Sequence, residues 1–183
     1  LAESMGGFKK GDLVGGNAFD TKRDARFPLG IVLIENCRMW GFDRSNDDGA
    51  WAALYLRENV EVTVKGCSVD RSQVGCRMVA VRNGAALVCH IEDCKFTNCE
   101  AALRFEDFKE GSDTLTPDLT VENCHLGNCE KHLWFYNYRR TTGQGPWKPP
   151  TGVRISHCLF EPSIRLRLTT TDPKILRDAR QNL

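Results

Sequence analysis

The sequence predicts an all-β fold, a parallel β-helix solenoid of about five coils, and three observations carry this prediction. An eight-residue segment centred on a cysteine recurs without gaps, and successive cysteines are 30, 27, 30 and 34 residues apart. Apolar residues alternate with polar ones on both sides of each cysteine, which is typical of strands with one buried face. The residue before each cysteine mostly belongs to the types that tolerate left-handed backbone geometry, so each coil is expected to bend there. A repeat of this length with bends at fixed places predicts a solenoid.

The first strand of each coil is expected to end just before the bend. Its buried face has an Ile or Val three residues before the cysteine: Ile34, Val64, Ile91, Val121 and Ile155. The bend itself falls on the residue that directly precedes the cysteine: Asn36, Gly66, Asp93, Asn123 and His157. Because Gly, Asn and Asp adopt positive φ most readily, we expect one left-handed corner per coil at this place.

The second strand follows the bend, and its cysteine is expected to point inward: Cys37, Cys67, Cys94, Cys124 and Cys158. An apolar residue two positions later lies on the same face: Met39, Val69, Phe96, Leu126 and Phe160. Cys99 and Cys129 are expected to start a second column at the next corner, with Cys76 and Cys89 near it or on strands.

A third short apolar strand is expected in every coil, at 53–56, 79–81, 103–105, 133–135 and 166–168. Three strands per coil, joined by bends and stacked about 4.8 Å apart, make a parallel β-helix. Residues 30–171 are therefore predicted to form the solenoid.

The two ends of the solenoid need covers, because open sheet edges pair with other chains. Asp172 and Pro173 are suited to the N-cap and first position of a helix, so residues 172–183 are predicted to form a C-terminal capping helix. Residues 1–29 are expected to be an irregular N-terminal cap or a remnant of preceding coils. The chain begins at Leu1 without a leader peptide, which favours a processed piece of a longer protein.

The repeat resembles that of the right-handed parallel β-helix proteins of the pectin-lyase-like superfamily. The motif is clearest at 91–99, Ile-Glu-Asp-Cys-Lys-Phe-Thr-Asn-Cys, and the resemblance covers roughly residues 30–168. It implies a right-handed winding, as does the general rule for crossovers between parallel strands. It implies no single activity, because the superfamily includes polysaccharide lyases, hydrolases, epimerases, phage tailspikes and non-catalytic interaction domains.

Nine cysteines are an odd number, and their ladder arrangement favours buried free thiols over disulfides. Cys124, His125, Cys129 and His132 have spacings found in metal sites, but zinc needs three or four such ligands on one side of the backbone. The repeat sends Cys124 inward and His125 outward, so we expect no metal and no cofactor. A core of free thiols and the absence of an Asn-x-Ser/Thr sequon favour a cytoplasmic location.

Charge and hydropathy narrow the classes of partner. The chain has 25 Lys and Arg against 24 Asp and Glu, a net charge of +1, so a nucleic-acid partner is not expected. No apolar run is long enough for a membrane-spanning helix. The outward column before the bend carries mixed charges, typical of a solvated sheet face: Glu35, Lys65, Glu92, Glu122 and Ser156. No recognisable lyase or hydrolase motif is present, so no catalytic residue is assigned.

Arginine and aromatic residues gather on the outward positions of the third strand: Tyr55, Arg57, Arg82, Arg104, Trp134, Tyr136, Arg165 and Arg167. Exposed residues of these types are enriched at binding sites. Two long segments, 106–118 and 137–152, leave the same corner in adjacent coils. We therefore predict a binding patch made of Arg104, Trp134, Tyr136, Arg139, Arg140, Trp147 and Lys148. The alternative is that Trp134 and Trp147 only pack the segment 137–152 against the sheet.

Three functions fit these features. The preferred one is a non-catalytic β-helix binding module of a larger protein, with a protein or an acidic glycan as ligand. The alternative is a carbohydrate-active enzyme, or its remnant, acting on an acidic polysaccharide; its arginines would bind substrate carboxylates, and Tyr136 or His132 would move protons. A structural spacer or assembly element comes third.

Overall fold

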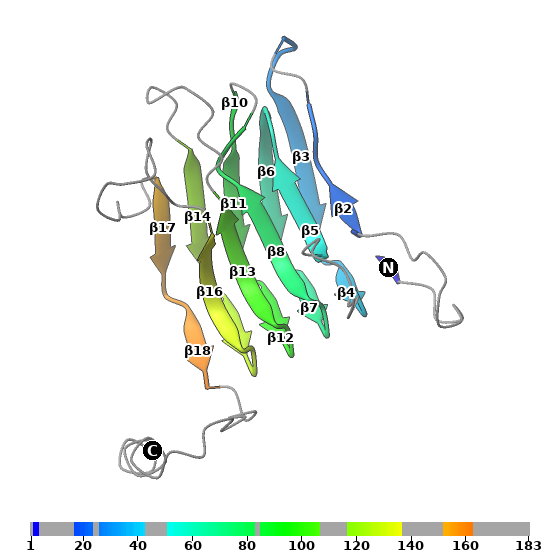
Figure 1. Ribbon diagram of the computed structural model, residues 1–183, viewed down its shortest axis with the longest axis vertical. Helices are drawn as coiled ribbons and strands as arrows, with labels where there is room; N and C mark the ends of the chain where they lie inside the picture. Colours follow the sequence, from blue (N-terminus) through cyan, green and yellow to red (C-terminus); the bar gives the residue numbers. More distant parts are fainter. Residues whose placement is uncertain are drawn as a thin grey trace.

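Three parallel β-sheets wind along the chain as a β-solenoid (Figure 1). A computed structural model of the chain describes residues 2–3, 17–23, 26–42, 51–82, 85–106, 117–136 and 152–162. Within these residues every regular element is a strand. The predicted all-β parallel solenoid is therefore confirmed. The capping helix predicted for 172–183 and the strand predicted for 166–168 lie outside the described residues.

The first sheet precedes the cysteine corner, with strand order β17-β14-β11-β6-β3. Its strands are β3 (Gly30–Glu35), β6 (Val60–Lys65), β11 (Val88–Glu92), β14 (Asp118–Glu122) and β17 (Val153–Ser156). The second sheet follows the corner in the order β1-β4-β7-β12-β15-β18. Its strands are β1 (Ala2–Glu3), β4 (Arg38–Trp40), β7 (Ser68–Asp70), β12 (Lys95–Thr97), β15 (His125–Gly127) and β18 (Leu159–Glu161).

The third sheet has the longest strands and the order β16-β13-β8-β5-β2. Its strands are β2 (Phe19–Asp20), β5 (Ala52–Arg57), β8 (Val74–Val79), β13 (Ala101–Glu106) and β16 (Lys131–Tyr136). A short antiparallel pair, β9 (Val81–Arg82) with β10 (Ala85–Ala86), leads from the third sheet back to the first. In Figure 1 successive coils lie side by side from β3 in blue to β17 in orange.

Strand register stacks equivalent side chains into columns that form one continuous core. The predicted Ile/Val column of the first sheet is paired strand by strand from Ile34 to Ile155. The second sheet adds the predicted column from Met39 to Phe160, in which Phe96 is fully buried. In the third sheet, Phe105 stacks on Phe135 with ring centres 5.0 Å apart. Period-two patterning was therefore sufficient to identify these inward positions.

The corner before the cysteine is left-handed in every coil, as predicted. The φ angles are 53° at Asn36, 61° at Gly66, 53° at Asp93, 53° at Asn123 and 52° at His157. A Cβ on Gly66 would come within 2.6 Å of the Asn36 amide oxygen, so this position favours glycine. The next corner, expected near Cys99 and Cys129, lies between the second and third sheets and is left-handed as well; its positive φ angles fall at Gly41, Arg71, Asn98 and Asn128.

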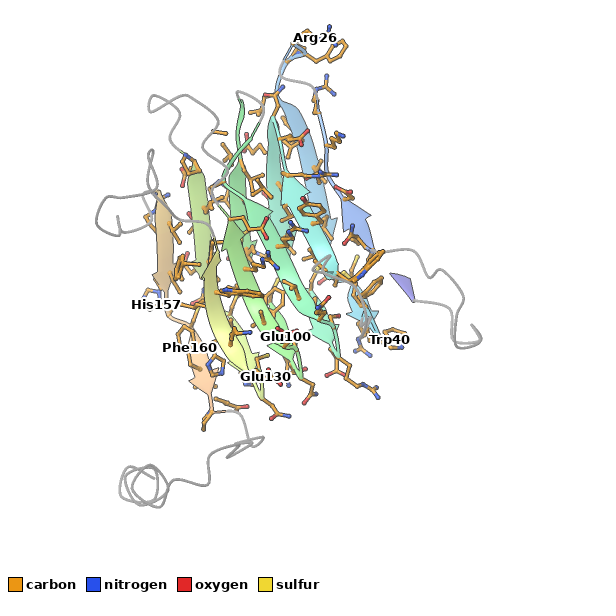
Figure 2. All side chains as sticks on the ribbon, in the orientation of Figure 1. Arg26, Trp40, Glu100, Glu130, His157 and Phe160 are labelled. Carbon is orange, nitrogen blue, oxygen red and sulfur yellow. The ribbon has the colours of Figure 1, made fainter. Side chains whose placement is uncertain are left out.

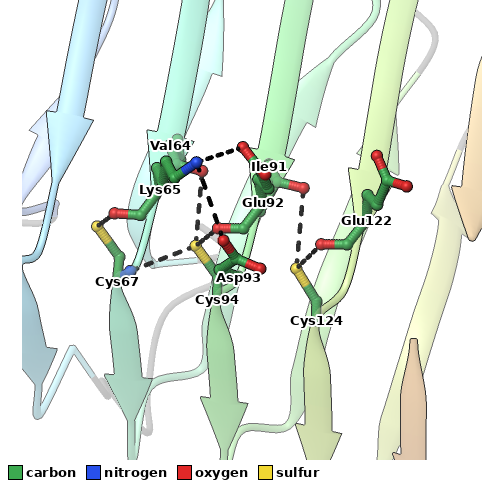
Figure 3. A network of polar contacts seen from close by, with 9 residues as sticks. All are labelled: Val64, Lys65, Cys67, Ile91, Glu92, Asp93, Cys94, Glu122 and Cys124. Atoms are coloured by element: carbon green, nitrogen blue, oxygen red, sulfur yellow. Dashed lines mark hydrogen bonds and ion pairs between the residues drawn. The ribbon is translucent and has the colours of Figure 1, made fainter. Parts of the chain in front are cut away.

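The corner cysteines form a ladder of thiols that connects successive coils (Figure 3). The single S–H of Cys94 is shared between the Glu92 carbonyl of its own coil, 3.1 Å from Sγ, and the Val64 carbonyl of the preceding coil, 3.6 Å from Sγ. The Cys94 sulfur also accepts the Cys67 N–H at 3.4 Å. Cys124 repeats the two donor contacts, to the Glu122 and Ile91 carbonyls. The predicted inward cysteine column is thus confirmed, and its thiols help to satisfy the backbone polar groups of the corner.

Alkylation of the native protein is expected to modify Cys37 and Cys158 first, because all nine thiols are free and only these two are incompletely buried. The others should react on the order of 100-fold more slowly, since a reagent reaches them only when a coil opens. Burial also raises the pKa of the Cys76 and Cys89 thiols, which lowers their thiolate fraction. Mass spectrometry of timed iodoacetamide samples measures the nine rates. Equal rates at all nine positions would contradict the buried ladder.

One detail of the sequence prediction is wrong. In the second coil the third strand was placed at 79–81, but the strand that joins the third sheet is β8, at Val74–Val79. Consequently Arg77, and not Arg82, occupies the outward arginine position of that coil. Residues 1–29, expected to be an irregular cap or a remnant of preceding coils, include two short strands, β1 and β2, which extend the second and third sheets by one strand each.

Candidate binding face

The outer face of the third sheet carries the arginine and aromatic residues that the sequence singled out. Strand pairing places one residue from each strand in a row across this face: Asp20, Tyr55, Arg77, Arg104 and Trp134. A second row, two residues further along the strands, contains Arg57, Val79, Glu106 and Tyr136. Long side chains in these two rows reach across neighbouring strands and form a continuous network.

The β2 end of the network is centred on Tyr55. The guanidinium groups of Arg57 and Arg77 each lie 4.3 Å from the centre of the Tyr55 ring, which is cation–π geometry. Arg57 also forms a two-point ion pair with Asp20, Nε to Oδ1 and Nη2 to Oδ2, both at 2.9 Å. Tyr55 is thus held between two cations, and one of them is neutralised by a carboxylate from the neighbouring strand.

Glu106 lies at the centre of the network and is fully buried. Arg77 donates to both of its carboxylate oxygens, Nε to Oε1 at 2.8 Å and Nη2 to Oε2 at 2.9 Å. Arg104 forms a further ion pair with Oε1. A buried carboxylate is tolerated only with such partners, so Glu106 keeps the two arginines in place and they compensate for its removal from water.

Trp134 occupies the β16 end of the network. The Arg104 guanidinium lies 4.3 Å from the centre of its ring system and the Lys131 ammonium 4.4 Å. Lys131 also pairs with Glu100, labelled in Figure 2, at 3.1 Å between Nζ and Oε1. Trp134 is half-buried and packs on a small apolar cluster of the same face, formed by Ala52, Tyr55, Val74, Val79 and Ala101.

Most of this face is buried, which differs from the exposed surface that the sequence predicted. Tyr55 is 8% exposed, Arg104 6%, and Glu106 0%. A strand pattern shows which side chains point outward but not what lies over them, so this could not be read from the sequence. The network is accessible at both ends: the Lys131 and Glu100 side chains at the β16 end are 42% and 38% exposed, and the Asp20 side chain at the β2 end is 38% exposed.

The structure brings together only some of the predicted site residues. Arg104 and Trp134 lie on adjacent strands in direct contact. Tyr136 of β16 is paired with Glu106 of β13, and the Tyr136 side chain is outside the described part of the structure. The other predicted site residues, all in the segment 137–150, also lie outside it: Arg139, Arg140, Trp147 and Lys148.

Sequence reasoning missed Arg77, Glu106 and Lys131. A usable signal was present, because the outward residue of the third strand follows the corner cysteine by ten positions in three coils. Arg77 lies ten residues after Cys67. Arg104 and Trp134 lie ten residues after the corner cysteines of the next two coils, Cys94 and Cys124. This ten-residue spacing from the corner cysteine identifies Arg77 as the outward residue of its strand.

The remaining charged groups on the sheet faces form separate pairs. On the first sheet, Lys65 Nζ lies 3.0 Å from the Glu92 carboxylate, within the outward column of mixed charges that the sequence predicts. On the second sheet, His125 Nε2 lies 2.9 Å from the Glu161 carboxylate. Within the described residues, no three His, Cys, Asp or Glu side chains are grouped so that they could bind a metal ion. The same residues include no helix long and apolar enough to cross a membrane.

Another carboxylate lies at the second left-handed corner. Burial opposes the charge on Asp70, but hydrogen bonds from Asn98 at 2.6 Å and Thr97 at 3.0 Å, together with the Arg71 ion pair, outweigh it and lower the pKa of Asp70. Asn98 in turn accepts a hydrogen bond from Asn128 of the next coil. This cluster satisfies the groups of the corner and leaves the carboxylate poorly suited to proton transfer.

No protein-family model, no curated protein and no solved structure matches this chain. The fold assignment therefore depends on the strands and their register alone.

Proposed function

We propose that this chain is a non-catalytic binding module, built as a right-handed β-helix of the pectin-lyase-like type, which recognises carboxylate-bearing ligands at the β16 end of the third sheet. The observation that carries the proposal is the ordered contact of Trp134 with both Arg104 and Lys131 on the last described strand of this sheet. Arginine and tryptophan dominate the energetics of binding sites, and a guanidinium suits a carboxylate.

The local charge supports an acidic ligand, although the whole chain is nearly neutral. The chain continues from β16 directly into residues 137–150, which contain Arg139, Arg140 and Lys148 and no acidic residue. Three cations in the fourteen residues that follow β16 in sequence favour a ligand with repeated carboxylates. Acidic polysaccharides and acidic protein segments share this chemistry.

The absence of a catalytic role is inferred from the state of the carboxylates in the network. General acid–base catalysis requires a carboxyl group that can reach the substrate. Glu106 is fully buried between Arg77 and Arg104, and Glu100 is paired with Lys131. In the described part of the network these groups are engaged as structural ion pairs, which supports binding over turnover.

Arg140→Ala is expected to weaken binding of polygalacturonate or of poly-glutamate at least about 5-fold, since one charge-assisted contact contributes roughly 1 kcal/mol or more. Isothermal titration calorimetry with each polymer measures the affinities and shows whether the glycan or the polypeptide is preferred. The matched control is Lys95→Ala, which removes one exposed cation from the second sheet and should leave both affinities unchanged. Trp134 is a poor probe because it also packs on buried residues.

Three results would count against the proposal. Failure of the wild-type chain to bind either polymer would refute it. An equal loss of affinity in the Lys95 variant would show non-specific charge attraction. Release of new reducing or unsaturated ends from polygalacturonate, lost in the Arg140 variant, would instead support the carbohydrate-active enzyme.

A further inference from the structure

We infer that the column of corner cysteines binds a soft, two-coordinate metal ion, Cu(I), between the sulfurs of neighbouring coils. Cys67 and Cys94 form the site that the structure defines most completely. The site lies at the corner between the first and second sheets, so the inference does not depend on the ligand proposed for the third sheet.

The first observation is that the thiols of the column are placed alike in every coil. Strand pairing on both sides of the corner puts Cys94 directly opposite Cys67 of the preceding coil. Each of the five sulfurs lies between 3.1 and 3.4 Å from the carbonyl oxygen two residues earlier in the chain. Such equal contacts require one side-chain orientation, and Figure 3 shows the sulfurs of Cys67, Cys94 and Cys124 pointing the same way in a row.

The spacing of the sulfurs decides between a disulfide and a metal bridge. Side chains of one orientation on paired parallel strands repeat at the strand spacing, about 4.8 Å. A disulfide needs Cβ atoms about 3.8 Å apart and sulfurs about 2 Å apart, so two coils would have to move together to form one. A metal–thiolate bond is about 2.3 Å long, so one ion on the line between two sulfurs spans about 4.6 Å. The column therefore matches a metal bridge.

The number of ligands selects the metal. A structural zinc ion takes four ligands, whereas the part of the chain that the structure describes has no group of three His, Cys, Asp or Glu side chains that could hold a metal ion. Two opposed thiolates are sufficient for an ion that accepts only two soft ligands. Cu(I) is such an ion and is among the metals that thiolates select. The column therefore favours Cu(I) over Zn(II).

Backbone N–H groups at the corner stabilise the thiolates that a metal ion requires. The Cys67 sulfur accepts the Cys37 N–H at 3.4 Å, and the Cys94 sulfur accepts the Cys67 N–H at the same distance. Hydrogen bonds to a ligand sulfur tune metal–thiolate centres. Both bonds are part of the fold itself, so the two sulfurs are held in position before an ion arrives.

Binding exchanges two protons for one ion. Cys67 and Cys94 release their S–H protons to solvent, two Cu–S bonds form, Cu(I) keeps its oxidation state, and the site carries one net negative charge. The carbonyls two residues before these cysteines lose a contact with S–H, which is a weak donor. They keep their backbone bonds, from the Asn36 N–H at 2.9 Å and the Gly66 N–H at 3.1 Å. Deprotonation therefore leaves neither carbonyl unpaired.

Two buried thiols outside the columns provide a matched comparison. Cys76 lies between two leucines of the neighbouring strands, and Cys89 lies between a valine and a leucine. Neither has a sulfur opposite it on a paired strand, although both are fully buried. Cys99 and Cys129 lie opposite each other at the next corner and form a second, shorter column. The variants below leave that second column intact.

Anaerobic titration of the full chain with Cu(I), in competition with a coloured Cu(I) chelator, tests the inference. Replacing Cys67 and Cys124 together by alanine leaves no two neighbouring thiols among the corner cysteines. This variant should bind about two ions fewer than wild type, because five thiols in a row provide two separate pairs. The control replaces Cys76 and Cys89 by alanine, which removes the same number of buried thiols, and should bind as many ions as wild type.

X-ray absorption of the Cu(I)-loaded wild-type chain gives the coordination directly and does not depend on the stability of any variant. Two sulfur neighbours per ion are expected, and Zn(II) should bind at least about 100-fold more weakly than Cu(I). A wild-type chain that cannot hold Cu(I) against the chelator would overturn the inference. So would an equal loss of ions in the control variant, which would show uptake by free thiols in general. Three or more ligands per ion would equally exclude the two-sulfur bridge.

Discussion

Glu106→Gln should lower the free energy of unfolding by about 3 kcal/mol or more, the largest electrostatic effect expected in this fold. The carboxylate is fully buried and receives both donors of Arg77 in addition to Arg104. Glutamine keeps the volume but leaves two arginines without a counter-charge, and the Arg104 side chain is only 8% exposed. Urea unfolding followed by circular dichroism measures the loss.

Glu100→Gln provides the matched control for this prediction. Glu100 also pairs with a cation of the same outer face, Lys131, but both side chains are more than one-third exposed. Such a pair contributes at most about 1 kcal/mol, so the control should unfold close to wild type. Similar losses in the two variants would mean that the burial of Glu106 has no special energetic consequence.

Phe96→Ala should destabilise the fold by about 3–5 kcal/mol, because it removes a fully buried aromatic ring from the centre of the core. The site cannot readily collapse around the cavity. A Cβ on Gly75 would already lie within 2.7 Å of the Phe96 ring, so β8 is in close contact with it from the third sheet. The same urea titration gives the size of the loss.

Phe160→Ala is the comparison that isolates burial, since both phenylalanines belong to one inward column of the second sheet. Phe160 lies at the end of that column, is 42% exposed and makes an edge contact with His132. Its removal should cost well under half as much as that of Phe96. A loss equal to that of Phe96→Ala would show that the last strand is as well packed as the interior.

The features predictable from the sequence are those set by local spacing. An Ile or Val three residues before each of the five corner cysteines, and an Asn, Asp, Gly or His one residue before it, were sufficient to locate two strands and a corner in every coil. These positions depend on side-chain alternation and on φ, both of which are properties of a few neighbouring residues. The third strand of the second coil was misplaced because Gly75 interrupts its apolar pattern.

The candidate site was less predictable because it depends on register between strands. Arg77 and Glu106 are 29 residues apart, and only the pairing of β8 with β13 brings them within 2.8 Å. Outward position was correctly inferred for Tyr55 and Arg104, but their burial was not, because alternation contains no information about what covers an outer face. The roles assigned to residues 139–148 remain predictions, since they lie outside the described structure.

The constant length of the cysteine corner has a consequence for how this molecule can change. From the first sheet to the second, each coil makes its turn in the same two residues, whereas the connections into and out of the third sheet range from two residues to sixteen. The corner that contains the cysteines therefore keeps the strands of successive coils in register. The connections to and from the third sheet can vary in length without shifting that register. New binding segments can be inserted in the connections to and from the third sheet. Whole coils can be added or removed in units that begin and end at a corner cysteine, and every column of side chains is then preserved.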